Sequence, residues 1–149
     1  MFRINRLEEQ YHELVAADQR EYRELTESVL QIGSGFANYL ASDDGSNALS
    51  GSKPLVICGM QSENGFINPD PERFARVGRN MQFTLRLDLA ESVTEIPPSY
   101  FIFKLELMPK DNQIHLFDRE NAEEILLHKG FISAYEYLYN AVSNRLRQL

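Results

Sequence analysis

The chain has 149 residues and a formal net charge of −7, and 43% of its residues are hydrophobic. These values suit one globular domain, residues 1–149, with a core large enough to need neither disulfides nor a structural metal. An acidic surface repels nucleic-acid phosphates, and no stretch is long and apolar enough to span a bilayer. We therefore expect a cytoplasmic protein that binds neither nucleic acid nor membranes.

A long amphipathic helix is predicted over residues 5–41. Asn5 and Glu8 have the spacing of an N-terminal capping box. Uninterrupted, this helix would be about 55 Å long, which is more than the core of one small domain needs. Gly33 and Gly35 each disfavour a helix interior by about 1 kcal/mol, so a break near them is the alternative. Mostly apolar residues recur every three or four positions and form one stripe: Leu7, Tyr11, Leu14, Asp18, Tyr22, Leu25, Val29, Ile32, Phe36 and Tyr39.

Residues 42–53, with the sequence SDDGSNALSGSK, predict a flexible linker or loop because they are rich in Ser, Asp and Gly. Two glycines followed by Ser-Lys also resemble a phosphate-binding loop. Such a loop follows a strand, opens a helix and has Ser or Thr after its Lys. Here the segment follows a helix and precedes a strand, and Lys53 is followed by Pro54. We therefore reject phosphate binding at this segment.

The remaining residues, 54–149, predict a sheet followed by C-terminal helices. An apolar run indicates a buried strand near residues 55–61. Strict alternation from Met81 to Leu89 indicates a strand with one solvent-exposed face. Residues 100–117 have the pattern of a hairpin that turns at residues 109–112. Together these segments predict about four antiparallel strands.

A short helix is predicted between the first two of these strands. Asp70 suits its N-cap, Pro71 its first turn and Gly78 the position after its end, so the helix spans Pro71 to Val77. The element order is then helix, strand, short helix, three strands and two C-terminal helices. This order predicts an α+β fold in which the helices pack on one face of an antiparallel sheet of about four strands.

Two helices are predicted after the hairpin. Asp118 suits the N-cap of the first, which ends at Gly130. Ser133 and Glu136 have the spacing of a capping box for the last helix, which begins near Ala134. One helix that continues through Gly130 is the alternative.

Few residues indicate catalysis. Cys58 lies in the apolar run and is predicted to be a small core residue. No cluster of Asp, His and Cys has the spacing of a metal site, so neither a metal nor a cofactor is expected. The first polar groups to test for catalysis are His115, Glu106 and Tyr100. His115 would act as an acid or base only with a carboxylate such as Glu106 or Asp88 beside it.

The long stripe favours protein–protein interaction, since it extends beyond one small core. We expect a homodimer with coiled-coil contacts, in which Asp18 fixes the register. Tyr137 joins the interface because it cannot face inwards together with Tyr135 and Tyr139. If the helix breaks at Gly33, both halves pack on the chain's own sheet and the chain is a monomer. The predicted interface consists of Leu7, Tyr11, Leu14, Asp18, Tyr22, Leu25 and Tyr137.

Two functional hypotheses follow from these patterns. The leading one is a non-catalytic, acidic interaction module of the adaptor, chaperone-like or inhibitor and immunity type, whose partners are a second copy and a basic protein. The alternative is a small-ligand-binding or enzymatic α+β domain with a pocket between the sheet and the helices.

Overall fold

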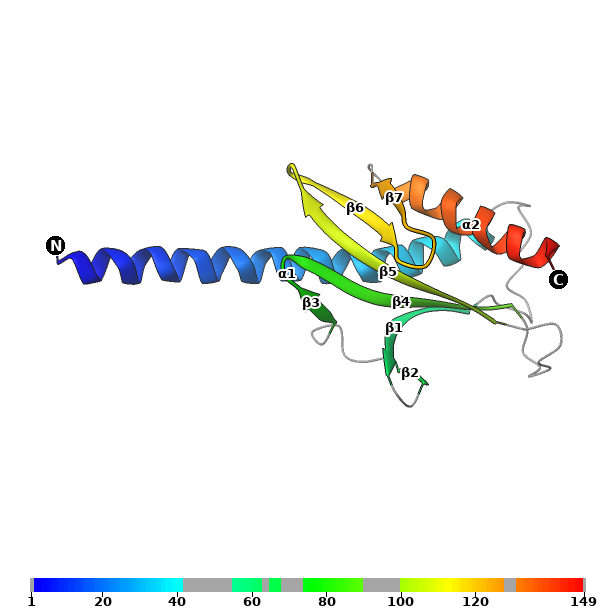
Figure 1. Ribbon diagram of the computed structural model, residues 1–149, viewed down its shortest axis with the longest axis horizontal. Coiled ribbons are helices and arrows are strands. Elements are labelled where there is room, and N and C mark those ends of the chain that lie inside the picture. Colours follow the sequence, from blue (N-terminus) through cyan, green and yellow to red (C-terminus); the bar gives the residue numbers. More distant parts are fainter. Residues whose placement is uncertain are drawn as a thin grey trace.

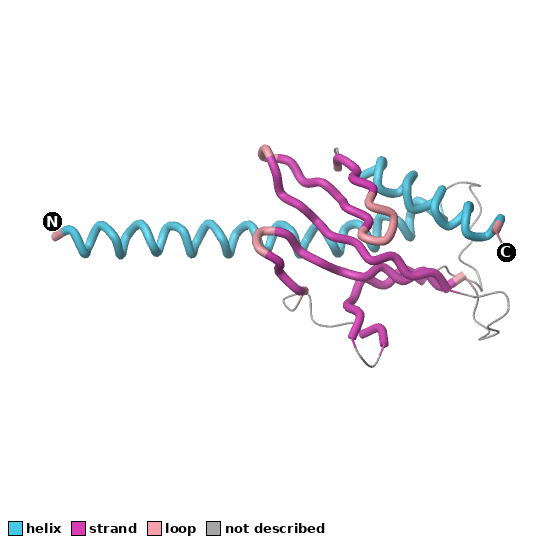
Figure 2. The backbone as a smooth tube through the Cα atoms, viewed as in Figure 1, coloured by secondary structure: helices cyan, strands magenta, loops and turns pink. Residues whose placement is uncertain are grey.

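The computed structural model describes residues 2–41, 55–62, 65–67, 74–89, 100–127 and 131–148. A long helix comes first, a run of strands follows, and a second helix ends the described chain (Figure 1, Figure 2). The elements are α1 (Arg3–Ala41), β1 (Leu55–Ser62), β2 (Gly65–Ile67), β3 (Ala75–Val77), β4 (Asn80–Asp88), β5 (Tyr100–Lys110), β6 (Gln113–Asp118), β7 (Glu123–Leu126) and α2 (Ile132–Arg147). The predicted linker, residues 42–53, lies outside the described residues.

The described strands form one antiparallel sheet of seven strands in the order β2-β1-β4-β5-β6-β7, with β3 also paired to β4. On one edge, β4 pairs with β5 from Met81 to Asp88. The other edge of β4 pairs with two strands. β3 pairs with the first half of β4, and β1 pairs with its second half. The fold is α+β as predicted, but the sheet has seven strands rather than about four.

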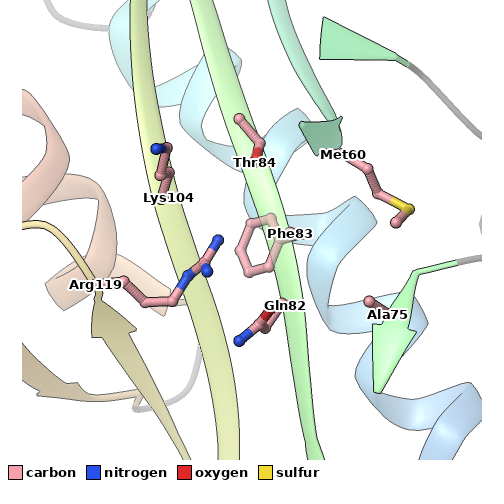
Figure 3. Close-up of a pocket in the computed structure, with 7 residues that line it drawn as sticks. All are labelled: Met60, Ala75, Gln82, Phe83, Thr84, Lys104 and Arg119. Carbon is pink, nitrogen blue, oxygen red and sulfur yellow. The ribbon is translucent and has the colours of Figure 1, made fainter. Parts of the chain in front are cut away.

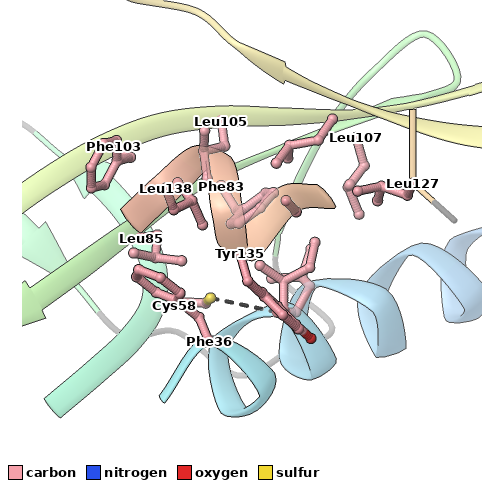
Figure 4. Close-up of a cluster of buried hydrophobic side chains, with 14 of the residues drawn as sticks. Phe36, Cys58, Phe83, Leu85, Phe103, Leu105, Leu107, Leu127, Tyr135 and Leu138 are labelled. Atoms are coloured by element: carbon pink, nitrogen blue, oxygen red, sulfur yellow. Dashed lines mark hydrogen bonds between the residues drawn. The ribbon is translucent and has the colours of Figure 1, made fainter. Parts of the chain in front are cut away.

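Both described helices lie on the same face of the sheet (Figure 1). Alternate residues of β4 and β5 point towards the helices and are buried. The second half of α1 contributes to the same buried cluster and contacts β1 and β4. Figure 4 shows part of this cluster. We call the opposite side of the sheet the outer face. The buried cluster includes Leu25, Val29, Ile32 and Phe36 of α1, Met81, Phe83, Leu85 and Leu87 of β4, Phe101, Phe103, Leu105 and Leu107 of β5, and Leu138 of α2.

The helix α1 runs through Gly33 and Gly35 without a break. At these two positions other elements approach the helix backbone closely. A Cβ atom on Gly33 would lie 3.0 Å from Cys58 Sγ, and one on Gly35 would overlap the Tyr135 hydroxyl. That hydroxyl donates a hydrogen bond to the carbonyl of Gln31 at 3.3 Å. Close packing against β1 and α2 therefore outweighs the low helix propensity of the two glycines.

Neither helix begins at its predicted cap. α1 begins at Arg3, and the backbone amide of Asn5 donates to the carbonyl of Phe2 at 3.1 Å, so Asn5 is not the N-cap. α2 begins at Ile132 and has no side-chain cap. The Ser133 hydroxyl donates instead to the carbonyl of Leu126 at 2.9 Å. This serine therefore ties α2 to β7, a role that its spacing from Glu136 does not reveal.

The predicted short helix from Pro71 to Val77 is wrong in its second half, since Ala75–Val77 forms β3. Residues 71–73 lie outside the described residues. Gly78 was expected to end that helix, and it has a φ of 62°. It lies instead in the two-residue connection between Val77 and Asn80, which are paired. A glycine with positive φ suits both a helix end and a tight hairpin, so the residue alone did not distinguish them.

The predicted helix after Asp118 is also wrong, because a turn leads there into β7. Asp118 is completely buried at the end of β6. It accepts hydrogen bonds from the Glu120 amide at 3.0 Å, from Asn121 Nδ2 at 3.0 Å and from the Tyr137 hydroxyl at 2.6 Å. An aspartate that binds a backbone amide two residues ahead stabilises a turn as readily as a helix start. The expected helix end at Gly130 lies outside the described residues.

Tyr137 was predicted to face away from the core, and this prediction is wrong. Its ring packs against the core, and the hydrogen bond to Asp118 holds its hydroxyl inside. Burial and this contact raise its pKa to about 12. The exposed tyrosine of α2 is Tyr139, whose side chain is 45% exposed. Helical geometry correctly required one outward tyrosine, but it did not identify which one.

We expect Gly35→Ala to destabilise the protein, although alanine favours helices. The new methyl group would displace Tyr135, and overpacking of this kind costs about 1–3 kcal/mol. Chemical denaturation should show this loss for Gly35→Ala, while Ser34→Ala, at an exposed neighbouring position, should be neutral or slightly stabilising. In a Tyr135→Ala background the Gly35→Ala change should cost much less. An equal loss of stability in both backgrounds would show that Gly35 does not pack against Tyr135.

We expect Tyr137→Phe to lower the free energy of unfolding by about 1–3 kcal/mol, because it removes a hydrogen bond to a buried carboxyl group. Tyr139→Phe is the matched control, since it removes a hydroxyl from an exposed ring on the same helix. Urea denaturation of the two variants measures the difference. Similar stability of both would show that Asp118 does not depend on Tyr137.

Candidate functional site

The first half of α1 extends beyond the sheet (Figure 1). We call residues 3–17 the arm, and at 1.5 Å per residue it is about 22 Å long. Four large side chains on it are 59–68% exposed in the described structure: Ile4, Leu7, Tyr11 and Leu14. Scattered apolar residues are common on protein surfaces, but a continuous row of this kind is a candidate interaction surface.

The exposed row of the arm lies in line with the buried row of the same helix. Because 18 residues make five turns of an α-helix, residues 18 apart point in the same direction. The arm residues therefore continue the face that packs on the sheet. The aligned pairs are Ile4 with Tyr22, Leu7 with Leu25, Tyr11 with Val29, and Leu14 with Ile32. Within the described chain this single face is covered in its second half and uncovered in its first.

The arm leaves the sheet at a cluster of ion pairs, which we call the neck. Arg79 contacts Glu21 at 2.6 and 3.1 Å, and Arg76 contacts Glu21 at 3.3 Å and Asp18 at 3.7 Å. The hydrogen bond from Arg79 is the main cause that lowers the pKa of Glu21. The Tyr22 hydroxyl also donates to the carbonyl of Phe74 at 3.4 Å. These contacts join the β3–β4 hairpin to α1 and define where the arm begins.

A groove of about 600 Å³ lies next to the neck. Glu21, Glu24 and Leu25 of α1 form one side. The turn between β5 and β6 forms the other, with Asp111 and Asn112 in left-handed conformations at φ of 56° and 61°. The groove therefore opens where the covered part of the helix face meets the arm.

The predicted interface residues fall into three groups. Leu7, Tyr11 and Leu14 are exposed on the arm, and Asp18 and Tyr22 lie at the neck. The other two predicted residues, Leu25 and Tyr137, pack in or against the chain's own core. The sequence pattern identified the stripe but did not show where the sheet stops covering it. Ile4, which belongs to the exposed row, was missed because the predicted helix began after it.

The three polar groups named for catalysis lie on the outer face but are not brought together. Glu106 accepts hydrogen bonds from Asn80 at 2.9 Å and Gln82 at 2.8 Å. The carboxylate beside His115 is Glu124, 3.6 Å from its Nδ1 atom, rather than Glu106 or Asp88. The ring of Tyr100 lies 4.6 Å from the guanidinium carbon of Arg86. Each group therefore has a separate neighbour, as in the polar layer of an ordinary sheet surface.

Cys58 is a core residue, as predicted. Its thiol donates to the carbonyl of Val29 at 3.5 Å, and burial raises its pKa to about 12. A neutral, buried thiol is a poor nucleophile. Among the described residues, no group of three or more His, Cys, Asp and Glu side chains is arranged to hold a metal ion. In the same residues, no helix is long and apolar enough to cross a membrane.

The outer face contains a small pocket of about 210 Å³ (Figure 3). Thr84 pairs with Gly59 on one side and with Lys104 on the other, and the amide of Arg119 donates to the carbonyl of Lys104 at 2.9 Å. Thr84 is only 1% exposed. Lys104 and Arg119 have no carboxylate partner within the described residues. The pocket is lined by Met60, Ala75, Gln82, Phe83, Thr84, Lys104 and Arg119.

The chain matches no family model, no curated protein and no solved structure.

Proposed function

We propose that the protein is a non-catalytic interaction module that forms a homodimer through the exposed row of the arm. The observation that carries the proposal is the continuity of one helix face, which is buried from Leu25 to Phe36 and exposed from Ile4 to Leu14. A helix face with this spacing is typical of coiled-coil contacts. An adaptor, chaperone-like or inhibitor and immunity role in the cytoplasm, with a basic protein as partner, fits its net charge of −7.

The size of the exposed row indicates a modest affinity. Full burial of a side chain such as Leu contributes about 1.5–3 kcal/mol, and the arm side chains have about 60% of their surface left to bury. Eight such side chains in a dimer then contribute about 7–14 kcal/mol. Association costs about 4–15 kcal/mol in lost freedom of motion. The gain and the cost are of similar size, so we expect weak association and a dimer that depends on concentration.

The double variant Leu7→Glu plus Leu14→Glu should be monomeric and as stable as the parent monomer, because both side chains are exposed in the single chain. Asn5→Glu plus Ala16→Glu adds the same charge to exposed positions on the opposite side of the arm and is the matched control. Sedimentation velocity over a range of concentrations measures the mass. The proposal fails if the parent chain stays monomeric at high concentration, or if both variants dimerise equally.

A second candidate function, binding of a small anion, is supported by the outer-face pocket. Two cationic side chains, Lys104 and Arg119, lie at a concave site next to the nearly buried Thr84. Among the described residues no carboxylate neutralises either cation. A carboxylate or phosphate group of a small ligand is the chemistry that such a site would bind.

Inorganic phosphate tests the pocket by thermal shift. Phosphate also stabilises proteins non-specifically, so the parent chain must be compared with variants. We expect Tm to rise with phosphate concentration in the parent and in Arg147→Gln, which removes an exposed charge far along the sequence on α2. The Tm of the Lys104→Gln variant should rise less with phosphate concentration. An equal rise in all three proteins would exclude phosphate as a ligand of the pocket.

A further inference from the structure

We infer that the arms of two copies pair in antiparallel orientation, so that the tip of each arm lies against the neck of the other. This inference rests on the proposed homodimer and specifies its geometry. The occupant of the exposed row is thus a second copy of the same row. Four features of the described structure support this arrangement over a parallel one.

The position of the sheet is the first feature. The sheet lies on the side of α1 to which the exposed row also points, because the two rows are in line. A second helix laid parallel and in register on this side would run directly into the space that β4 and β5 occupy. An antiparallel helix runs the other way, and its own sheet lies beyond the tip of the first arm. Only the antiparallel orientation therefore keeps the two sheets apart.

The order of side chains along the arm is the second feature. With the two-fold axis near residue 9, Ile4 faces Leu14 of the second copy, and Leu7 faces Tyr11 of the second copy. The remaining two contacts repeat these by symmetry, so each large apolar residue of the row meets another one. In an antiparallel coiled coil, each pair of facing residues combines the two core positions of the heptad, a of one helix and d of the other. The pairs named above do the same.

The length of the arm is the third feature. In this register residue 3 of the second copy lies opposite residue 15, just before Asp18 and the neck. The second arm therefore covers the exposed row and stops where the sheet begins. A helix face that is half covered in one chain becomes covered along its length in the pair.

The charges at the two ends of the arm are the fourth feature. The first turn of α1 contains no acidic residue, and it carries Arg3 and Arg6. Positive charge at a helix N-terminus is unfavourable, because the free amides there already carry partial positive charge. Asp18 is the polar member of the stripe, with its side chain 66% exposed. The antiparallel pair brings this carboxylate to the N-terminal end of the second helix, whereas a parallel pair places it opposite its own copy.

Disulfide formation between engineered cysteines tests the orientation in the full-length chain. Ile4→Cys and Leu14→Cys chains, carrying different tags, are mixed and oxidised, and each is also oxidised alone. In the antiparallel pair the mixed disulfide forms, because residues 4 and 14 face each other. Two copies of residue 14 then lie about 15 Å apart along the axis, too far for a disulfide. The native thiol of Cys58 is buried and does not compete.

The outcomes separate the orientation from the dimer itself. Mixed disulfides without Leu14→Cys homodimers support the inference. Homodimers of Leu14→Cys without mixed disulfides overturn the orientation and leave the proposed dimer in place. A parent chain that remains monomeric in sedimentation overturns both.

Asp18→Asn gives an independent readout that does not depend on oxidation. The antiparallel arrangement predicts a several-fold weaker dimer, because the second helix loses the negative group at its positive end. A parallel arrangement predicts a stronger dimer, because two facing carboxylates are removed. Glu9→Gln, at an exposed position away from the row, is the control and should change the dissociation constant little.

Discussion

The packing of the second half of α1 on the sheet is the contact on which the rest of the structure depends. Leu25, Val29, Ile32 and Phe36 of this half are buried in one cluster with the alternating apolar residues of β4 and β5. The two glycines in this half let Cys58 and Tyr135 reach the helix backbone, so β1 and α2 are positioned by the same helix. A single long helix thus organises a sheet whose strands are mostly joined by short hairpins.

The same helix also explains why a row of large apolar side chains lies outside the part of the chain that packs on the sheet. Its apolar face is continuous, whereas the sheet that covers it ends at the neck. There Glu21 binds two arginines of the β3–β4 hairpin, which close the core with polar groups instead of further apolar ones. Beyond this point the helix face is no longer needed for folding. Its apolar character is the basis of the contact with a second arm that we propose.

Sequence patterns predicted the elements whose periodicity is strong. The long helix, the alternating strand β4 and the β5–β6 hairpin all carry regular repeats. The errors concern short elements: β3 and β7 have three and four residues, too few to show a period, and their flanking turn residues also suit helix ends. The stripe on α1 was found, but its division into covered and exposed parts was not. That division depends on where distant strands end, which no local pattern contains. The outer-face pocket likewise arises from cross-strand neighbours.

Nearly all residues of the arm are exposed in the described structure, and this has a consequence for the dynamics of the arm. An isolated helix of about 15 residues is marginal in water, and the arm remains helical because the anchored half supplies its nucleus. Glu9 and Glu13 repel each other one turn apart, and the basic first turn opposes the helix dipole. Fraying should therefore start at the tip and stop at the neck, which gives the molecule a gradient of local unfolding energies. Any partner that binds the helical arm also stabilises its helix, so binding and helix formation are thermodynamically coupled.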